Sequence, residues 1–583
     1  MCNGSALTQG MPRIVDNAGR GIMPVGIESF VDVLRRFVYV DKTLVVRDLV
    51  DGGGVTLFCR PRRFGKSTTM RMLRAFFELS VEGFVPDNRG LFENLAIWDE
   101  DERYRAECGA HPVIYLSLGG CGRGSYEDTL AGIAQQMADE VVRHRYLLES
   151  PKLMGFEKAR LERVAACEAS AQELRSSLKQ LSELLRRHHG GRQTVILIDE
   201  YDTPVNDGYI NGYRREILDF YRIWLTDALK GTDALYCAAL TGVLRVSQES
   251  IFSELNNVVV NTSLDEEFGE AFGFTRDEAR ALAAHVGMDD RFDEMTRWYD
   301  GYHMGGSEVF NPWSVIRYLR AGVAQPYWTN TSSNGIVRDL IAHADDEATV
   351  ELATLSSGGT VAKPLDLRTV FDDLSVNPEA VWPQLYQAGY VTTRDTGVPN
   401  DDEMLRRLRV PNLEVVRLFN KELTDRSVVM AGTRERLDAL HRALVAGDSE
   451  AFAHLMRRVL LDSPSYHDLL AERDYHVLLL GLLYAVPGYR PATSNRESGD
   501  GRCDVLLEPL PGNAPNLPAI AMEVKFVSPG GGVDASDEEL ARVAREDALA
   551  QAVRLGYGHG LAGTGLLRWG IAFSGKRVAV AHG

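Results

Sequence analysis

The segment FCRPRRFGKSTTM, residues 58–70, restricts the fold of this chain more than any other stretch. Its triplet G-K-S at 65–67 ends the phosphate-binding pattern G-x-x-x-x-G-K-[ST], although Arg60 stands where that pattern has its first glycine. The apolar, β-branched run at 55–59 is typical of a buried strand, and apolar residues at helical spacing follow the triplet. Strand, loop and helix in this order surround a phosphate with backbone N–H groups. The sequence therefore predicts a nucleotide-binding α/β domain.

The residues of this loop have separate expected roles. Lys66 would reach the outer phosphates of the nucleotide, and the Ser67 hydroxyl would hold Mg²⁺. Arg60, Arg62 and Arg63 would add positive charge at the same place. A basic surface turn without a ligand is the alternative interpretation. The residues expected to contact the nucleotide are Arg62, Arg63, Phe64, Gly65, Lys66, Ser67 and Thr68.

A second part of the expected site is the apolar run at 194–200, which predicts a strand ending in Asp199 and Glu200. Asp199 would hold the magnesium ion through water, and Glu200 would polarise the attacking water. Buried strands often end in one acid, so this strand alone is moderate support. Together with the upstream G-K-S triplet, it indicates a hydrolytic site.

A further predicted strand at 234–240 ends in Thr241. A hydroxyl at the end of a neighbouring strand can sense the terminal phosphate, although Thr241 as a plain strand-end residue is the equal alternative. Arg245 would stabilise charge in the transition state, and an interdomain salt bridge is its alternative role.

Seven short motifs stand in an order that resembles a known family. They are YVDKT (39–43), RPRRFGKS (60–67), LIDEYD (197–202), LTGVLRVS (240–247), IFSELNN (251–257), YDGY (299–302) and NPWSV (311–315). The chain is similar to the bacterial AAA-ATPase-like family, whose members typically carry a C-terminal nuclease-like domain of the PD-(D/E)xK superfamily. The resemblance implies that Arg60 is a family variant of the loop. It also implies ATP binding at Lys66 and Ser67 and magnesium at Asp199.

The expected fold class is α/β with several domains. A P-loop AAA-ATPase-like domain with a parallel sheet is expected at 22–260, a winged-helix-like lid at 261–335, a helical connector at 336–439 and a restriction-endonuclease-like α/β domain at 440–583. Residues 151–189 have helical periodicity and predict an amphipathic helical insertion. The YDGYH loop is expected to pack aromatic rings between domains, with ligand contact as the alternative.

The C-terminal domain contains a candidate nuclease site. Asp504 enters one predicted strand, and Glu523 and Lys525, two positions apart on the next, project from one face. Two acids and a lysine suit phosphodiester hydrolysis, because the acids hold Mg²⁺ or Mn²⁺ and the lysine supports charge in the transition state. A degenerate domain that binds without cutting is the alternative.

Other polar residues would support this site. Glu472, on a preceding predicted helix, would complete the acidic cluster, and Glu497 could take that place instead. Gln551 falls on the following helix, where related nucleases carry a supporting polar residue. The metal ligands expected in the whole chain are Ser67, Asp199, Asp504 and Glu523.

Composition limits the partners. The net charge of −18 gives no support to nucleic-acid binding, which normally uses a basic surface. The seven scattered cysteines fit a reducing cytoplasm, and neither a signal peptide nor a membrane helix is expected.

The leading hypothesis is an ATP-hydrolysing protein coupled to a metal-dependent nuclease, acting on DNA in preference to RNA, in defence or repair. A homo-oligomer is also considered. The alternative is a nucleotide-switched signalling or scaffold protein whose C-terminal domain binds without cleaving.

Overall fold

The computed structural model divides the chain into two compact units, each with its own sheet and hydrophobic core. Unit 1 comprises Met1–Ser332, Lys363–Arg406 and Pro411–Glu414, and unit 2 comprises Ser333–Ala362, Arg407–Val410 and Val415–Gly583. The structure describes all residues except 1–11, 28, 245–257, 330–345, 368–377, 396–404, 463–471, 499–500, 514–515, 529–533, 559–560 and 562–564.

A five-stranded parallel sheet forms the centre of unit 1, as the sequence predicts. The strands lie in the order β4-β5-β6-β3-β7, and every neighbouring pair is parallel. They are β3 (Gly54–Cys59), β4 (Val113–Ser117), β5 (Thr194–Asp199), β6 (Leu235–Gly242) and β7 (Val258–Asn261). Because parallel strands end at the same edge of a sheet, the phosphate loop after β3 and the acids after β5 lie at one edge, with the end of β6 between them.

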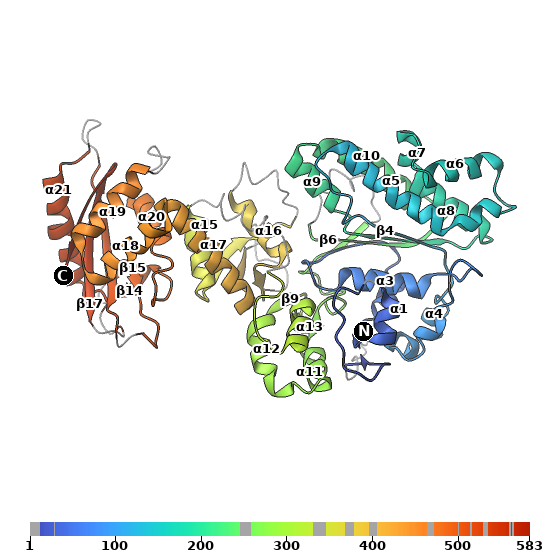
Figure 1. Cartoon of the computed structure of the whole chain (residues 1–583), viewed down its shortest axis with the longest axis horizontal. Helices are drawn as coiled ribbons and strands as arrows, with labels where there is room; N and C mark the ends of the chain where they lie inside the picture. The colour runs from blue at the N-terminus through green and yellow to red at the C-terminus, as the bar shows by residue number, and fades with distance from the viewer. Residues whose placement is uncertain are drawn as a thin grey trace, which may run out of the picture. The chain divides into compact units, whose positions relative to one another are not determined.

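Helices cover both faces of this sheet (Figure 1), which explains why its strands are almost continuously apolar. α1 and α3 lie on one face, and α5, α8 and α10 lie on the other. The helices of this part are α1 (Phe30–Arg36), α2 (Val45–Gly52), α3 (Lys66–Phe77), α4 (Glu102–Arg105), α5 (Tyr126–Arg143), α6 (Gly155–Ala165), α7 (Ala171–Arg175), α8 (Ser177–His188), α9 (Thr203–Asn211) and α10 (Arg214–Leu229). A two-stranded sheet pairs β1 (Ile14–Val15) with β2 (Tyr39–Val40).

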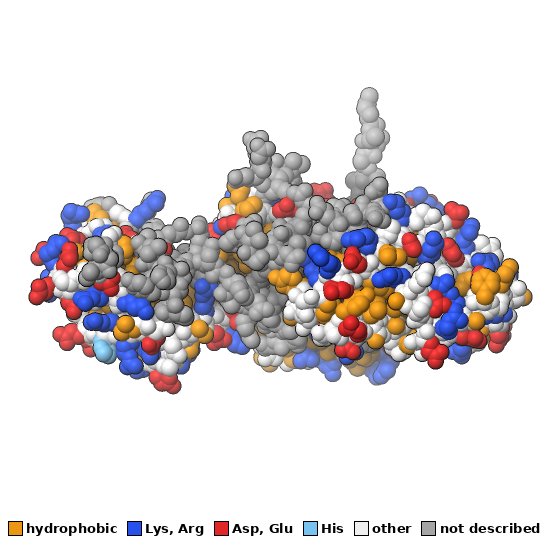
Figure 2. Space-filling model, turned by 90° about the horizontal axis from the view of Figure 1, so that it is seen from above, with side chains coloured by type: hydrophobic (Ala, Val, Ile, Leu, Met, Phe, Trp, Pro, Cys, Tyr) orange, Lys and Arg blue, Asp and Glu red, His pale blue; other side chains and the backbone are white. Residues whose placement is uncertain are grey.

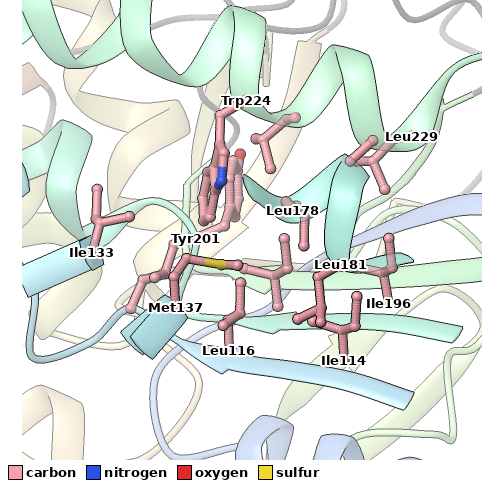
Figure 3. Packing of buried hydrophobic residues seen from close by; sticks show 14 of the residues in the cluster. Ile114, Leu116, Ile133, Met137, Leu178, Leu181, Ile196, Tyr201, Trp224 and Leu229 are labelled. Atoms are coloured by element: carbon pink, nitrogen blue, oxygen red, sulfur yellow. The ribbon is translucent and has the colours of Figure 1, made fainter. Parts of the chain in front are cut away.

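The core of unit 1 lies between the sheet and the second group of helices. Figure 3 shows Leu116 of β4, Met137 of α5, Leu181 of α8 and Trp224 of α10 packed together, and all four side chains are buried. The expected helical insertion at 151–189 is thus three helices, α6 to α8. Its last helix, α8, contributes directly to the main core through its apolar face.

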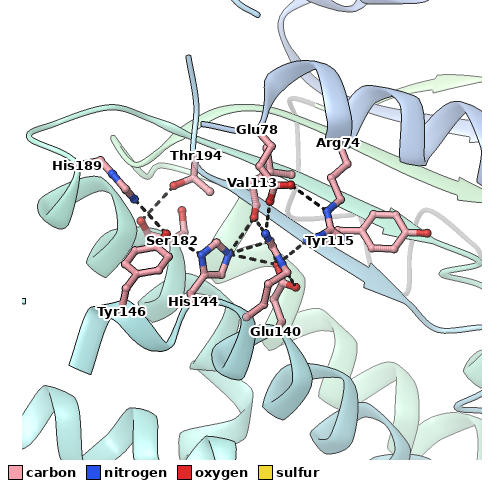
Figure 4. A network of polar contacts seen from close by, with 11 residues as sticks. Arg74, Glu78, Val113, Tyr115, Glu140, His144, Tyr146, Ser182, His189 and Thr194 are labelled. Carbon is pink, nitrogen blue, oxygen red and sulfur yellow. Dashed lines mark hydrogen bonds and ion pairs between the residues drawn. The ribbon is translucent and has the colours of Figure 1, made fainter. Parts of the chain in front are cut away.

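A buried polar network joins α3 to the opposite face of the sheet (Figure 4). Arg143 of α5 forms ion pairs with Glu78, at the end of α3, and with Glu140, and its guanidinium also donates to the Val113 carbonyl of β4. Although burial opposes the shift, Arg143 holds the pKa of Glu140 well below its usual range. The helix that follows the phosphate loop is therefore anchored at its far end by charged groups.

A smaller module follows the parallel sheet in unit 1. It contains the antiparallel sheet β8-β10-β9 and a separate apolar core that includes Trp298, Tyr299 and Tyr318. Its elements are β8 (Phe274–Thr275), α11 (Arg276–His285), α12 (Phe292–Tyr299), β9 (Tyr302–Met304), β10 (Ser307–Phe310) and α13 (Pro312–Ala321). The winged-helix-like lid at 261–335 and the other domain limits stay predictions.

In the next part of the chain, successive segments belong alternately to unit 2 and unit 1. They are α15 (Asp346–Ser356), β11 (Val361–Pro364), α16 (Val381–Ala388), β12 (Thr392–Thr393), β13 (Leu405–Arg409) and α17 (Leu413–Ala431). Short 3₁₀ turns occur at Arg89–Leu91, Ala96–Asp99, Arg145–Glu149, Asp289–Arg291 and Pro378–Ala380.

The second unit has a mixed five-stranded sheet in the order β14-β15-β16-β17-β18. Only β16 and β17 are parallel, and the helices between them form the crossover that a parallel pair requires. Its elements are α18 (Arg434–Ala446), α19 (Ser449–Asp462), α20 (Glu472–Leu482), β14 (Thr493–Ser498), β15 (Gly501–Leu507), β16 (Ala519–Phe526), α21 (Asp537–Arg542), a π-helical segment (Val543–Leu549), α22 (Ala550–Arg554), β17 (Leu566–Ser574) and β18 (Arg577–His582). No helix among the described residues is long and apolar enough to cross a membrane.

Candidate functional site

The phosphate loop connects β3 to α3 at the expected place. Gly65 precedes the first turn of α3 with a left-handed φ of 87°, a conformation that glycine adopts without strain. The buried Lys66 ammonium donates hydrogen bonds to the main-chain carbonyls of Arg60 at 2.9 Å and Pro61 at 2.8 Å. Burial lowers the pKa of Lys66, while the carboxylates of Asp202 and Asp199 oppose the shift. The lysine is therefore held inside the loop and within the field of the acids.

Arg60 does not add charge inside the loop, contrary to the sequence-based expectation. Its fully buried guanidinium donates to the main-chain carbonyl of Asn261 at 3.0 Å and to the side-chain oxygen of the same residue at 2.5 Å. It also lies over the ring of Phe272, 5.3 Å from the centroid. Burial lowers the pKa of Arg60 to about 10. The residue that replaces the pattern's glycine thus ties the loop to the end of β7 and to the segment that follows it.

The next loop residues also face other parts of unit 1. The buried Phe64 ring packs edge-on against Tyr302, with centroids 4.9 Å apart. The Arg63 guanidinium lies 4.3 Å from the centroid of the Trp313 ring. Phe64 was expected to contact the nucleotide, but its ring is directed into this aromatic contact, so only its backbone is left for that role. Tyr302 belongs to the YDGYH segment, which therefore packs aromatic rings within unit 1, and a contact between domains stays a prediction. Thr68 and Arg62 are exposed, and Ser67 is half-buried.

Asp199 and Thr241 meet at the ends of neighbouring strands. The Thr241 hydroxyl donates to Asp199 Oδ1 at 2.5 Å, and both side chains are almost fully buried. The same hydroxyl oxygen accepts the Glu200 N–H at 3.4 Å. The proposed phosphate sensor is therefore bonded to the proposed magnesium ligand, and its sensor role stays a prediction.

Glu200 follows Asp199 with a left-handed φ of 54°, which is uncommon for a residue with a side chain. The residue is exposed overall, but loss of solvation around its carboxyl and the nearby Asp199 raise the pKa of Glu200, and Lys66 opposes the shift. A raised pKa improves a carboxylate as a base. Arg245, the remaining candidate from the sequence, lies outside the described residues.

Asp202 was not assigned a role from the sequence, although it ends the LIDEYD motif. It is buried, and its Oδ2 accepts the N–H groups of Val243 at 2.9 Å and Leu244 at 3.0 Å. A Cβ atom on Gly242 would lie 2.6 Å from the Tyr201 ring, so the last position of β6 also requires glycine. Three acids within four residues were the available signal that the motif does more than end a strand.

In unit 2, β15 and β16 bring the predicted nuclease residues together. The Lys525 ammonium lies 2.6 Å from Glu523 Oε1, and the Gln551 amide donates to the same oxygen. Asp504 Oδ2 accepts the Val524 N–H of β16 at 2.8 Å. Burial raises the pKa of Glu523, and Lys525 opposes that shift. Although burial acts against it, Glu523 raises the pKa of Lys525.

The two other candidate acids lie differently. Glu472 is exposed at the start of α20, and its Oε2 accepts the Phe526 N–H at 3.4 Å, at the end of β16. Glu497 lies on β14 with its backbone opposite Arg502, and its side chain is outside the described part of the structure. The segment at 496–507 is divided between two antiparallel strands, β14 and β15, with Ser498 paired to Gly501.

Comparisons with known proteins agree with the N-terminal geometry. A family described as "Predicted AAA-ATPase" matches residues 24–252. The "Uncharacterized protein in vnfD 5'region" of Azotobacter chroococcum mcd 1 is 30% identical over 438 residues, which cover 73% of this chain and 74% of that protein. The chain belongs to the AAA-ATPase-like family. The Aeropyrum pernix ORC2 protein, solved in ADPNP–ADP complexes, is 11% identical with a TM-score of 0.25 over 71% of this chain and 99% of that one, a likeness too low to argue from.

For an AAA-ATPase-like protein, the donor set at the phosphate loop fits a nucleotide with a hard cation. The Lys66 ammonium suits phosphate oxygens, and the Ser67 hydroxyl and Asp199 carboxylate are oxygen ligands of the kind that Mg²⁺ prefers. The N-terminus of α3 adds backbone N–H groups and the positive end of the helix dipole.

The fit of a cation to unit 2 rests on Glu523. Its Oε2 is buried and has no hydrogen-bond partner among the described residues. A buried carboxylate oxygen without a donor is a position that a cation would satisfy. Within the same described residues, no group of three or more His, Cys, Asp or Glu side chains could hold a metal ion. Asp504 and Glu523 would therefore be the protein's ligands, with water and substrate oxygens in the other positions, as is usual for Mg²⁺.

Proposed function

We propose that the protein binds and hydrolyses ATP with Mg²⁺ at the edge of the parallel sheet. The observation that carries the proposal is the buried Lys66, held at the start of α3 and coupled electrostatically to Asp199, Glu200 and Asp202. Lys66 would bind the outer phosphates, and Ser67 and Asp199 would hold the ion that neutralises phosphate charge. Glu200 would accept a hydrogen bond from the attacking water and orient it.

Two measurements test this function. Wild-type protein should bind ATP only weakly without Mg²⁺ and should release phosphate in its presence. Glu200→Gln should keep ATP affinity within about twofold and should lose hydrolysis by about 10²–10⁴-fold, because it keeps the shape of the side chain and removes the base. Unchanged hydrolysis in Glu200→Gln would exclude Glu200 as the base, and no ATP binding by the wild type would exclude the function.

We further propose that the C-terminal domain is a metal-dependent nuclease. Glu523, Asp504 and Lys525 support this role because the acids can hold a divalent ion beside a cation that stabilises a phosphorane-like charge. On the face drawn in Figure 2, side chains of both signs are interspersed over the described residues, so a substrate strand would be held mainly near the site itself. Single- and double-stranded DNA and RNA, each incubated with Mg²⁺ or Mn²⁺ and with EDTA, test the activity and the choice of polymer.

A second function is a candidate because of two observations. The described acids do not form a three-ligand group, and Lys525 occupies one oxygen of Glu523. Such an arrangement also suits a domain that binds a phosphate backbone without cutting it. A nucleotide-switched scaffold would bind DNA or RNA with and without EDTA, would cut neither, and would turn over ATP slowly.

We also propose that the two activities are coupled, and thermodynamic linkage makes any such coupling reciprocal. If ATP changes the affinity of the C-terminal domain for a polymer, the polymer must change the affinity for ATP by the same factor. Titrating ATP into Glu523→Ala protein, with and without the bound polymer, measures this factor. Equal ATP affinities, with cutting rates indifferent to ATP, would show two independent activities on one chain.

A further inference from the structure

The loop LGGCGRG at 118–124, directly after β4, is a feature that the proposed function does not use. Ser117 is paired with Asp199, and the Leu118 N–H donates to the Asp199 carbonyl at 2.9 Å. The loop therefore runs beside the end of β5, next to Glu200. Gly119 and Gly122 face acidic side chains there, whereas Gly120 and Gly124 do not.

Gly119 provides the space in which the Glu200 carboxyl lies. A Cβ atom on Gly119 would be 1.7 Å from Glu200 Oε2 and 2.8 Å from Glu200 Cδ, distances that real Cβ atoms do not show. The side chain of any other residue at position 119 would therefore overlap with the Glu200 carboxyl. Glu200 reaches the recess with a left-handed φ of 54°, and such strain persists only where the surrounding structure compensates for it.

The backbone of the loop cannot easily retreat from an added side chain. The Cys121 N–H donates to the Leu118 carbonyl at 3.0 Å, and the Tyr213 hydroxyl donates to the Arg123 carbonyl at 2.5 Å. Behind the loop, a Cβ on Gly132 of α5 would already be 3.1 Å from Cys121 Cα. A methyl group at position 119 would thus displace the flexible Glu200 side chain rather than the loop.

A second recess in the same loop ties it to α9. A Cβ atom on Gly122 would lie 2.1 Å from Asp207 Oδ2 and 3.2 Å from Asp207 Cβ. Asp207 belongs to α9, which begins four residues after Asp199. The recesses at Gly119 and Gly122 thus hold the glycine-rich loop close to Glu200 and to α9, which both follow β5 in the chain.

We propose that Gly119 is a positioning residue for hydrolysis, because the recess left by its missing side chain holds the Glu200 carboxyl in the orientation that activates the attacking water. Gly119 acts through Glu200 and not on the substrate. The inference rests on the proposed ATPase function and adds the requirement that β4, which carries no acid at its end, contributes to the site. In the recess the carboxyl stays within electrostatic reach of Lys66 and Arg62, and thus beside the phosphate loop.

The test compares Gly119→Ala with Gly120→Ala. Both residues lie in one loop without left-handed φ, but a Cβ on Gly120 has no atom within 4 Å. Gly119→Ala should lower kcat for ATP hydrolysis by about 10²-fold, because a displaced base loses most of its contribution, and should leave ATP affinity within about twofold. Gly120→Ala should match the wild type in both. A wild-type or increased kcat in Gly119→Ala overturns the inference.

A double variant shows whether Gly119 acts through Glu200. If it does, Gly119→Ala added to Glu200→Gln causes no further loss of kcat. A further loss of similar size in that background would show a separate structural effect and would overturn the proposal. Thermal unfolding and ATP binding report on the fold of each variant.

If Gly119→Ala does not fold, Gly122→Ala addresses the same loop, with Gly124→Ala as its control, since a Cβ on Gly124 also has open space. Gly122→Ala should lower kcat by about 10-fold at unchanged ATP affinity, because the loop shifts with Asp207. Equal rates for these two variants overturn the inference. Loss of hydrolysis in Glu200→Gln but not in Gly119→Ala refutes the recess and leaves the ATPase function standing, whereas a wild type that does not hydrolyse ATP refutes the function itself.

Discussion

The nucleotide site of unit 1 and the carboxylate site of unit 2 hold their charged side chains in different ways. Lys66 is held by main-chain carbonyls of its own loop, and Asp199 by a hydroxyl from the next strand. Glu523 is held by two other side chains, Lys525 and Gln551, and one of its oxygens has no partner among the described residues. The first site depends on the path of the backbone, whereas the second depends on the identity of a few side chains.

This difference determines which substitutions should impair each site. Arg60 and Phe64, whose side chains hold the phosphate loop, and Gly119, which leaves space for Glu200, should matter for the first site although none of their side chains is directed at the phosphates. In the second site, a single substitution at Glu523 removes a proposed ion ligand and also leaves Lys525 without its ion pair. Substitutions at many positions should therefore each impair the first site, whereas substitution of a few side chains should abolish the function of the second.

The largest expected effect is that of Glu523→Ala on cleavage. Loss of an ion ligand should remove about 4 kcal/mol of transition-state stabilisation, or about three orders of magnitude in rate. ATP hydrolysis should not change. Gel assays of cleavage and phosphate-release assays on one preparation measure both, and Glu538→Ala, an exposed acid of the same unit, is the control. Cleavage that survives in Glu523→Ala would show that Glu523 is not an ion ligand and that another part of the chain cuts the polymer.

The second effect concerns Lys66→Ala and ATP affinity. Removing a buried ammonium that binds phosphate oxygens should weaken ATP binding on the order of 100-fold, because charge-assisted contacts contribute about 3 kcal/mol. Isothermal titration in the presence of Mg²⁺ measures the change. Lys179→Ala, in α8, is the matched control and should bind as the wild type does. An affinity like that of the wild type in Lys66→Ala would contradict a loop-based site.

A third prediction compares two arginines of one loop. Arg60→Met leaves the buried oxygens of Asn261 without their donor, so the free energy of unfolding should fall by about 2–3 kcal/mol, and ATP affinity should fall with it. Arg62→Met, at an exposed position, should change the free energy of unfolding by about 0.5 kcal/mol or less. Urea unfolding followed by tryptophan fluorescence distinguishes them, and equal changes would show that the buried contact of Arg60 adds nothing.

The smallest effect is a dependence of stability on pH in unit 1. Burial lowers the pKa of His189 to about 4 and also lowers that of His144. Between pH 6.5 and about 4 the unfolded chain therefore binds more protons at these residues than the folded one, and stability falls as pH falls. The melting temperature should drop by a few degrees more in the wild type than in His189→Gln between pH 7 and pH 5. Identical slopes would show that His189 does not contribute.

The sequence by itself determined the strands that carry the site residues. The apolar runs at 55–59 and 194–200 predicted β3 and β5 almost to the residue, because a strand covered on both faces must be apolar throughout. The G-K-S triplet located the start of α3, since glycine and a positive helix end are local properties. The spacing of Glu523 and Lys525 predicted a shared face, and their 2.6 Å ion pair follows from it.

Only the tertiary structure decided which residues, distant in sequence, contact and orient the side chains of the site. Nothing local to Arg60 indicates that its guanidinium turns toward Asn261, 201 positions along the chain, instead of toward the phosphate site. The recess at Gly119 is likewise a contact between the ends of two strands that are distant in sequence. A side chain at such a position is directed by the volume left free and by the buried acceptors that must be satisfied, and both exist only after the sheet has assembled.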